Sequence, residues 1–179
     1  LVASGWEKGA GPRGYVRINR PLGLRERLRR VLQRAVAIST VRSPSGSRRT
    51  AVVRDALPSD NELDRLWGRM ASGYRRCVVR DAAYLQWRYA GHPLGNYQFV
   101  EYRPRGELVA LAVIRLSPER AVLVDYIGPA SGREVKDALV DAFLELASRS
   151  RIAECTTSDP ELRRVLRSRG FLPTASAPL

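Results

Sequence analysis

The sequence has very little histidine and cysteine. Its 179 residues contain one histidine, His92, and two cysteines, Cys77 and Cys155. A structural zinc site needs four Cys or His ligands, and two distant cysteines in a chain of this size do not form a disulfide framework. No apolar run approaches the ~20 residues that a membrane-spanning helix requires. We therefore expect no metal site and place the protein in the cytoplasm.

Acidic residues are scarce in one part of the chain only. Residues 1–50 contain twelve Lys or Arg against two acidic residues, whereas residues 51–179 contain nineteen against sixteen. Most of the net charge of +13 therefore belongs to the N-terminal segment. Nearly all the basic residues are Arg, with Lys8 and Lys136 as the two lysines. The main part of the chain does not have the strong positive field that is typical of nucleic-acid-binding domains.

The N-terminal segment contains a predicted helix. From residue 22 to residue 38 the apolar residues recur with a period of 3.6, while arginines take the other faces, which predicts a basic amphipathic helix. Residues 39–50, STVRSPSGSRRT, are rich in Ser, Pro, Gly and Arg and indicate a linker. The helix has three interpretations. It docks between two domains, it lies on an anionic membrane surface, or it contacts nucleic acid, which is the least favoured because no aromatic residues are interleaved with the arginines.

The rest of the chain alternates between strand and helix patterns. We expect strands at 51–57, 97–102, 108–116, 121–127 and 151–157, helices at 59–71, 80–89, 133–149 and 160–169, and a last extended piece from 171. Short turns between 97 and 127 predict an antiparallel meander. Strand, helix and strand between 121 and 157 predict a right-handed parallel crossover. The predicted fold class is therefore α/β (α+β), with a mixed central sheet flanked by helices.

The two ends of the chain share a short pattern. LVASGW at 1–6 and LRSRGF at 166–171 both read as a helix end, a glycine and an aromatic residue before a strand. Their separation is about one domain, so we interpret residues 1–20 as the tail of a preceding copy of the same domain. The sequence begins with Leu rather than Met, and we expect it to be the C-terminal part of a longer chain. The predicted organisation is a tail at 1–20, the basic helix and linker at 21–49, and one domain at 50–179.

The element order and one motif carry a resemblance to a known family. The order of strands and helices, with the closing L-x-x-x-G-F, resembles the GNAT acyltransferase superfamily. More narrowly, VVRDAAYLQWRYAGHPLGNYQFVEY at 78–102 is similar to the R-D-x-x-Y-L-x-W-R-Y-x-x-x-P-x-x-x-Y stretch of a bacterial group in which two such domains often occur in tandem. The resemblance covers about 50–179. It implies a GNAT-like central sheet and a preceding GNAT-like domain as a partner in the same chain.

The resemblance also implies a site for acetyl-CoA or another acyl-CoA. In the superfamily the pantetheine arm bonds to the backbone of the strand at 121–127, and the pyrophosphate lies on the N–H groups of the following loop. The implied cofactor-binding residues are Val124, Tyr126, Ile127, Ala130, Ser131, Gly132 and Arg133. The loop departs from the family pattern R/Q-x-x-G-x-G/A, because Glu134, Val135 and Lys136 stand where G-x-G would fall. Leu166 stands where the family often has a proton-donating tyrosine.

Two carboxylates are candidate catalytic groups. Asp125 lies near the end of the strand at 121–127, and a buried carboxylate there would serve as a general base for the acceptor amine. Strict alternation along this strand leaves open whether Asp125 faces the core or the solvent. Glu154, on the strand at 151–157, is the second candidate. A nucleophilic cysteine needs a nearby histidine or a lowered pKa. Because His92 is the one histidine in the sequence, we interpret Cys155, the neighbour of Glu154, as a small core residue.

The W-R-Y motif allows two interpretations. In the first, Trp87, Arg88 and Tyr89, with Tyr84 three residues before Trp87, would line a pocket for the substrate, which we expect to be a small-molecule amine or a sugar amine. Alternatively, Leu85, Trp87 and Tyr89 pack the helix on the sheet and Arg88 bonds a carboxylate. We favour the structural interpretation of this helix.

Three functional hypotheses remain from the sequence. The first is an acyl-CoA-dependent N-acyltransferase with a degenerate pyrophosphate loop, in which catalysis rests on positioning and on proton removal from the ammonium. The second is a non-catalytic GNAT-like domain that serves as the partner half of a tandem protein. The third is a relative of the Fem-type aminoacyl transferases, which use aminoacyl-tRNA and would suit a basic surface.

Overall fold

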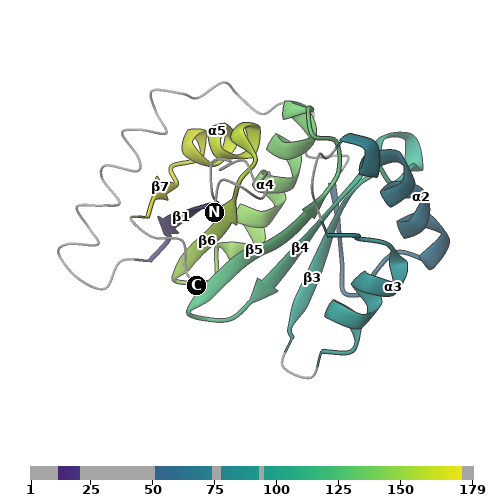
Figure 1. The fold of residues 1–179 in the computed structure, drawn as a ribbon. Helices are drawn as coiled ribbons and strands as arrows, with labels where there is room; N and C mark the ends of the chain where they lie inside the picture. Colours follow the sequence, from purple (N-terminus) through teal and green to yellow (C-terminus); the bar gives the residue numbers. More distant parts are fainter. Residues whose placement is uncertain (1–11, 21–50, 74–77, 93–94, 175–179) are drawn as a thin grey trace, which may run out of the picture.

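The computed structural model describes residues 12–20, 51–73, 78–92 and 95–174 (Figure 1). The predicted basic helix at 22–38, the linker at 39–50 and the pattern at 1–6 lie outside the described residues. Among the residues that are described, no helix is long and apolar enough to cross a membrane.

A mixed sheet of seven strands forms the centre of the molecule, in the order β2-β3-β4-β5-β6-β1-β7. The strands are β1 (Arg13–Ile18), β2 (Ala51–Arg54), β3 (Tyr97–Tyr102), β4 (Ala110–Leu116), β5 (Arg120–Ile127), β6 (Ile152–Thr157) and β7 (Leu172–Pro173). Strands β3, β4 and β5 form the predicted antiparallel meander, and β6 runs parallel to β5 after the intervening helix. The antiparallel meander, the parallel pairing of β5 with β6 and the mixed fold class are thus confirmed.

Helices cover both faces of this sheet (Figure 1). They are α2 (Asp60–Met70), α3 (Ala82–Leu85) with the π-helical turn η4 (Gln86–Ala90), α4 (Arg133–Ala147) and α5 (Pro160–Ser168), with short 3₁₀ turns η3 (Ala71–Gly73) and η5 (Pro104–Gly106). One core lies between the sheet and α4 with α5, and a second lies between the sheet and α2 with α3. Strand β4 contributes side chains to both cores. Its residues Ala110, Ala112 and Ile114 belong to the first core, and Leu111 and Val113 belong to the second.

Strand β1 lies inside the sheet. It pairs antiparallel with β6, from Arg13 opposite Thr157 to Ile18 opposite Ile152, and it also pairs with β7. Residues 13–18 thus give β6 a hydrogen-bonded neighbour on the side away from β5, and the buried ring of Tyr15 joins the core below α5. The assignment of residues 1–20 to a preceding domain stays a prediction.

The helix boundaries follow capping chemistry. At the start of α2, the Glu62 side chain reaches back to the N–H of Ser59 at 3.3 Å. At the start of α5, the Asp159 carboxylate accepts the N–H groups of Glu161 at 2.8 Å and Leu162 at 3.1 Å. Both helices begin where the sequence predicted.

Other boundaries differ from the prediction, and three of them have a local cause or a neighbouring turn. Strand β2 ends at Arg54 rather than at residue 57, because Asp55 turns to accept the Gln98 amide at 2.6 Å. The helix expected at 80–89 begins at Ala82, where the Asp81 carboxylate caps it by accepting the Tyr84 N–H. Strand β4 begins at Ala110, after the turn η5.

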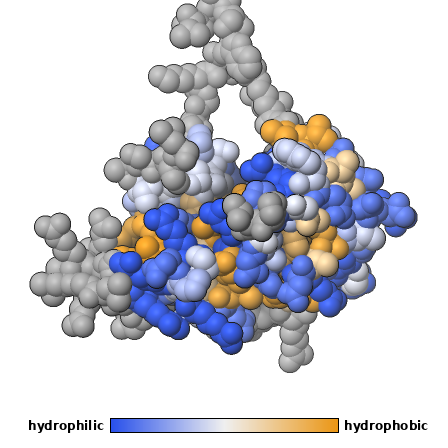
Figure 2. All heavy atoms as spheres, turned by 90° about the horizontal axis from the view of Figure 1, so that it is seen from below, coloured by the Kyte–Doolittle hydropathy of each residue, from blue (hydrophilic) through white to orange (hydrophobic). Residues whose placement is uncertain are grey.

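Some large apolar side chains are exposed among the described residues. They are Val53, Val78, Val79 and Trp87. Seen from below, the described surface is mainly hydrophilic, with apolar areas between the polar residues (Figure 2). Trp87 is 73% exposed, so the expectation that it packs its helix on the sheet is wrong. Leu85 and Tyr89 do the packing instead, and both are buried.

Candidate functional site

The candidate site begins at a β-bulge in β5. Val113 of β4 lies opposite Asp125, and Ile114 lies opposite Leu123, so Val124 is an extra residue on β5. A bulge of this kind bends the strand and increases its twist. The parallel pairing of β5 with β6 covers Arg120 to Leu123 and stops at the same point. The two strands therefore separate beyond the bulge.

A cavity of about 320 Å³ lies where the strands separate. Its walls come from the second half of β5, the end of β6 with the loop into α5, and the segment before α3. The lining residues are Pro12, Trp67, Val78, Arg80, Leu123, Val124, Asp125, Tyr126, Ile127, Cys155, Thr156, Thr157, Ser158, Asp159 and Leu162. Because Val124 to Ile127 have no β6 residue opposite them, this part of β5 presents a strand edge to the cavity.

Asp125 lies in the wall of this cavity and is held by three partners. Its two oxygens accept the Arg80 Nε at 3.0 and 3.1 Å, and Oδ2 also accepts the Tyr89 hydroxyl at 3.1 Å. The N–H of Tyr126 donates to Oδ1 at 2.9 Å. The carboxylate side chain is only 10% exposed. Asp125 is thus a fixed, ion-paired group at the edge of the cavity.

The bulge explains which way Asp125 points. Leu123 and Tyr126 pack on the side of α4, whereas Val124 packs with the core under α2 and α3. Asp125 meets Arg80 and Tyr89 on that same side. Two consecutive residues therefore face one side of the sheet, which simple alternation does not allow.

Arg80 is a site residue that the sequence did not predict, whereas Tyr89 was a candidate both for the substrate pocket and for packing of the helix. Both belong to the R-D-x-x-Y-L-x-W-R-Y motif, and their shared contact with Asp125 joins this motif to β5. Burial and the charge of Asp125 raise the pKa of the Tyr89 hydroxyl above its ordinary value, so the group remains a proton donor at neutral pH. The signal was available in the motif, where an Arg and a Tyr lie nine residues apart at the two ends of one short helix.

Tyr84, Trp87 and Arg88, which we expected to bind the substrate, lie away from the cavity lining. Tyr84 and Trp87 form a tilted ring pair with centroids 6.1 Å apart, and the Trp87 side chain is exposed. Arg88 donates its Nε to the Tyr89 hydroxyl at 3.3 Å, rather than to a carboxylate. The structure therefore brings Arg88 to the Asp125 cluster through Tyr89 and leaves Trp87 at the surface.

Glu154, the second candidate base, is separate from Asp125. It lies opposite Val122 of β5 and opposite Val16 of β1, within the paired part of the sheet. Its carboxylate forms an ion pair with Arg120 at 3.4 Å and does not line the cavity. The neighbouring Cys155 does line it. Burial raises the pKa of the Cys155 thiol to about 12, so at neutral pH it is a neutral core group, as predicted.

The loop after β5 has a tight geometry. A side chain at Gly128 would come within 2.7 Å of the Ala110 Cβ, so this position has room for glycine alone. The Tyr126 hydroxyl donates to the Pro129 carbonyl at 3.0 Å. Gly132 has a φ of 146°, which favours glycine, and it precedes the first residue of α4. The predicted loop and helix N-terminus are therefore present, with Ser131 exposed between them.

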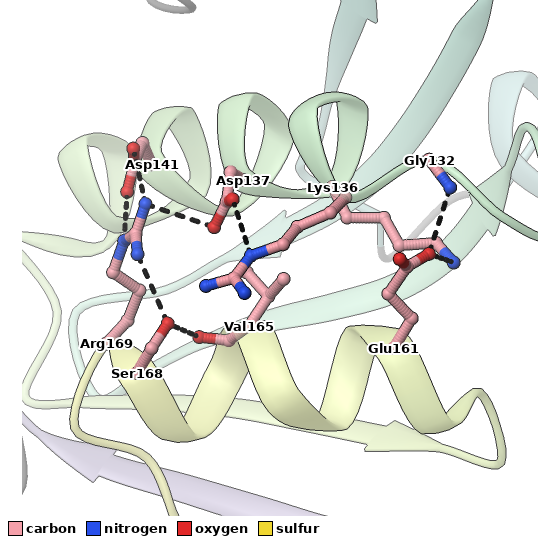
Figure 3. A network of polar contacts seen from close by, with 9 residues as sticks. Gly132, Lys136, Asp137, Asp141, Glu161, Val165, Ser168 and Arg169 are labelled. Atoms are coloured by element: carbon pink, nitrogen blue, oxygen red, sulfur yellow. Dashed lines mark hydrogen bonds and ion pairs between the residues drawn. The ribbon is translucent and has the colours of Figure 1, made fainter. Parts of the chain in front are cut away.

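Groups of the chain itself occupy this loop (Figure 3). The Lys136 ammonium is fully buried and contacts three acceptors, the Ala130 carbonyl at 2.6 Å, Asp159 Oδ2 at 2.8 Å and Glu161 Oε2 at 2.9 Å. Three acceptors match the three hydrogens of an ammonium group. The same Glu161 oxygen accepts the N–H of Gly132 at 3.0 Å. The bonds from Lys136 and Gly132 lower the pKa of the Glu161 carboxyl.

A second polar network continues along α4 (Figure 3). Arg169 binds both oxygens of Asp141, at 2.6 and 3.0 Å, and also reaches Asp137 at 3.2 Å. Arg133, one of the implied cofactor-binding residues, pairs with Asp137 one turn along the helix at 3.3 Å and is 61% exposed. The pairs of Arg169 fasten the end of α5 to α4, whereas the pair of Arg133 lies within α4.

The loop does not fit the pyrophosphate of an acyl-CoA. A pyrophosphate needs free N–H groups and a positive field, yet the Gly132 N–H is already bonded to a carboxylate. One ammonium and two carboxylates make up the Lys136, Asp159 and Glu161 cluster, which leaves it with a net charge of −1 when all are ionised. Leu166, at the position of the family's tyrosine, is buried and has no proton to donate.

Comparison with known proteins finds similarity in structure but no match in sequence. No protein-family model matches the sequence, and no curated protein is similar to it. Several solved structures align with it, among them three from bacteria. A conserved protein of unknown function from Staphylococcus epidermidis has 10% identity and a TM-score of 0.53 over 91% of this chain. A probable N-acyltransferase from Enterococcus faecalis has 9% identity and a TM-score of 0.60 over 97% of this chain. A protein from Novosphingobium aromaticivorans that is assigned to the GNAT family of acetyltransferases has 17% identity and a TM-score of 0.49 over 92%.

These alignments bear on the fold. The chain spans 57% of the Staphylococcus protein, 39% of the Enterococcus protein and 60% of the Novosphingobium protein. At 9% identity, the likeness to the Enterococcus protein shows a shared fold and no more than that. Membership of the tandem group with the W-R-Y motif stays a prediction.

Proposed function

We propose that this domain binds the acyl-thioester arm of a donor in the cavity between β5 and β6 and transfers the acyl group to an amine. The observation that carries the proposal is the bulge at Val124, which opens the strands and leaves a β5 edge on a cavity of about 320 Å³. An arm that contains amide groups would bond to this edge as an added strand does. The fold shared with a probable N-acyltransferase supports the same class of reaction.

Asp125 is the proposed proton acceptor. In acyl transfer the amine nitrogen attacks the thioester carbonyl, the C–S bond breaks, and the thiol leaves. The proton that the ammonium loses would pass through water to Asp125, the carboxylate at the cavity wall that Arg80 and Tyr89 fix in place. Leu166 has no proton to donate, so the second proton that the amine nitrogen loses after attack would pass through water to the departing thiolate, which leaves as a thiol.

The remaining roles follow from the placement of the other residues. Val124, Tyr126 and Ile127 would bind the arm through their backbone. The acceptor would be a small-molecule amine or sugar amine that enters past the segment with Arg80. A preceding GNAT-like domain in the same chain, and an anionic membrane surface for residues 22–38, remain proposals about partners.

Titration of the full chain with S-acetyl-pantetheine by calorimetry tests the binding step. We expect saturable binding at millimolar concentration or below. The variant Asp125→Asn should still bind the arm but lose transfer to a model amine. No binding by the folded wild type would refute the proposal.

A non-catalytic role as the partner half of a tandem protein is the second candidate. The observation that favours it is that Asp125 and Asp159, the two carboxylates of the cavity lining, are both ion-paired, with Arg80 and Lys136. In that case no amine would be acylated, whether or not S-acetyl-pantetheine binds. Full activity that depends on Asp125 would exclude this role.

A further inference from the structure

The Lys136 and Glu161 pair contacts the loop after β5, where the resemblance to the GNAT superfamily implies a donor phosphate. Glu161 Oε2 lies 3.0 Å from the Gly132 nitrogen and 2.9 Å from Lys136 Nζ (Figure 3). An anionic oxygen that accepts both a backbone N–H before a helix and an ammonium hydrogen makes the bonds that a phosphate oxygen would make. The chain thus supplies its own anion to the loop at 128–132.

The Glu161 carboxylate has an advantage over a free phosphate in the competition for the Gly132 N–H. Glu161 is held by α5, whose N-terminus is capped by Asp159 and whose end is fastened to α4 by Arg169. A group on a rigid element competes at high effective concentration and loses little further entropy on bonding. A free phosphate must displace it and then occupy a cluster with a net charge of −1, next to Glu134 in the first turn of α4.

The residues that replace the family's glycines make this arrangement possible. Lys136 stands in the first turns of α4, where its buried stem reaches below the loop to the Ala130 carbonyl. A glycine at this position would leave Asp159 and Glu161 without a cation. The Lys136 ammonium therefore holds the Glu161 carboxylate at the loop, and the arrangement needs both groups.

We propose that Glu161, with Lys136, determines the donor specificity by excluding phosphate from the loop at 128–132. The donor class that fits is a thioester arm that places no phosphate on this loop. This last statement rests on the proposed function, whereas the exclusion of phosphate does not. Glu161 acts as a specificity-determining residue, and Lys136 positions it.

The test compares the wild-type chain with Glu161→Ala and Glu161→Gln, using inorganic pyrophosphate as the probe. The Ala variant removes both the negative charge and the acceptor of the Gly132 N–H, whereas the Gln variant removes only the charge. Each chain is labelled with ¹⁵N, and the Gly132 amide signal is followed during titration. Glu119→Gln is the matched control, because Glu119 is an exposed glutamate whose nearest cation, Arg151, lies 3.8 Å away. Thermal unfolding of each variant confirms that it is folded.

We expect no pyrophosphate binding at the Gly132 amide in the wild type or in Glu119→Gln. Glu161→Ala should bind at least about tenfold more tightly, since a charge-assisted hydrogen bond becomes available, and Glu161→Gln should lie between them. The inference is overturned if the wild type shifts the Gly132 signal as strongly as Glu161→Ala, or if neither variant gains binding. Binding of S-acetyl-pantetheine is measured in the same samples. Its failure would refute the proposed function and leave the result at the loop unaffected.

Discussion

Lys136 on α4 and Glu161 on α5 are joined by a bond of 2.9 Å beneath the loop that follows β5. The lysine is fully buried, and Asp159 lies at 2.8 Å on its other side. A buried ammonium is stable only when its hydrogens are all bonded to acceptors. This pair therefore ties the conformation of the loop to the packing of α5 on α4.

Replacement of the buried lysine should destabilise the fold. In Lys136→Met the carboxylates of Asp159 and Glu161 lose their cation, and the free energy of unfolding should fall by about 3 kcal/mol. Arg133→Gln is the matched control, since it breaks an exposed pair on the same helix and should change the free energy by less than about 0.5 kcal/mol. Denaturant unfolding of both variants measures the difference. Equal effects of the two substitutions would contradict the account.

Removal of the Tyr89 hydroxyl should weaken the anchoring of Asp125. Tyr89→Phe loses the hydrogen bond to Asp125 Oδ2, and we expect a loss of about 1 kcal/mol in the free energy of unfolding. Trp87→Ala on the same helical segment serves as the control, because its side chain is exposed and should contribute less than about 0.5 kcal/mol. Chemical denaturation again gives the values. A larger effect at Trp87 than at Tyr89 would argue against this arrangement.

The pH dependence of the free energy of unfolding should reveal the lowered pKa of the Glu62 carboxyl. Hydrogen bonds from Arg103 and Ser59 lower the pKa of Glu62 from 4.5 to about 2. A carboxyl with a lowered pKa stabilises the folded state above its ordinary pKa, and this contribution is lost as the pH falls from about 4.5 to about 2. The difference in the free energy of unfolding between the wild type and Glu62→Gln should therefore be constant above pH 5. It should shrink as the pH falls from about 4.5 to about 2. A difference that does not vary with pH would disprove the assignment.

The Cys155 thiol should be inert in the folded protein. Its pKa of about 12, against an ordinary value of 9.0, lowers the thiolate fraction at pH 8 on the order of a thousandfold. We expect Ellman's reagent to label a Cys77→Ser variant, which retains Cys155 alone, at least about a hundredfold more slowly in buffer than in denaturant. Similar rates in both conditions would show that Cys155 is accessible and would place a reactive thiol in the cavity.

Much of the fold was predictable from the sequence because its signals are local. The two-sided burial of β4 appears as an unbroken apolar run from Ala110 to Ile114, and Pro160 with Asp159 marks the start of α5. The turn residues between the strands predicted the meander. Each of these features depends on neighbours in the chain.

The site depends on contacts between distant residues, which local patterns do not contain. No residue type marks the bulge at Val124, so the direction of Asp125 was open until the register with β4 was known. Lys136 and Glu161 lie 25 residues apart in sequence. The sequence showed that Lys136 replaces a glycine of the family pattern, but only the packing of α5 shows that a carboxylate meets it there. The position of β1 between β6 and β7 was missed for the same reason.

The most direct test of the account is an amide NMR titration of the ¹⁵N-labelled full chain with acetyl-CoA. This ligand carries both a thioester arm and a pyrophosphate, so one experiment compares the cavity with the loop. The account predicts that the amide signals of Val124 to Ile127 move with increasing ligand, while the Gly132 signal stays in place because Glu161 retains its N–H. Movement of the Gly132 signal together with those of β5 would contradict it.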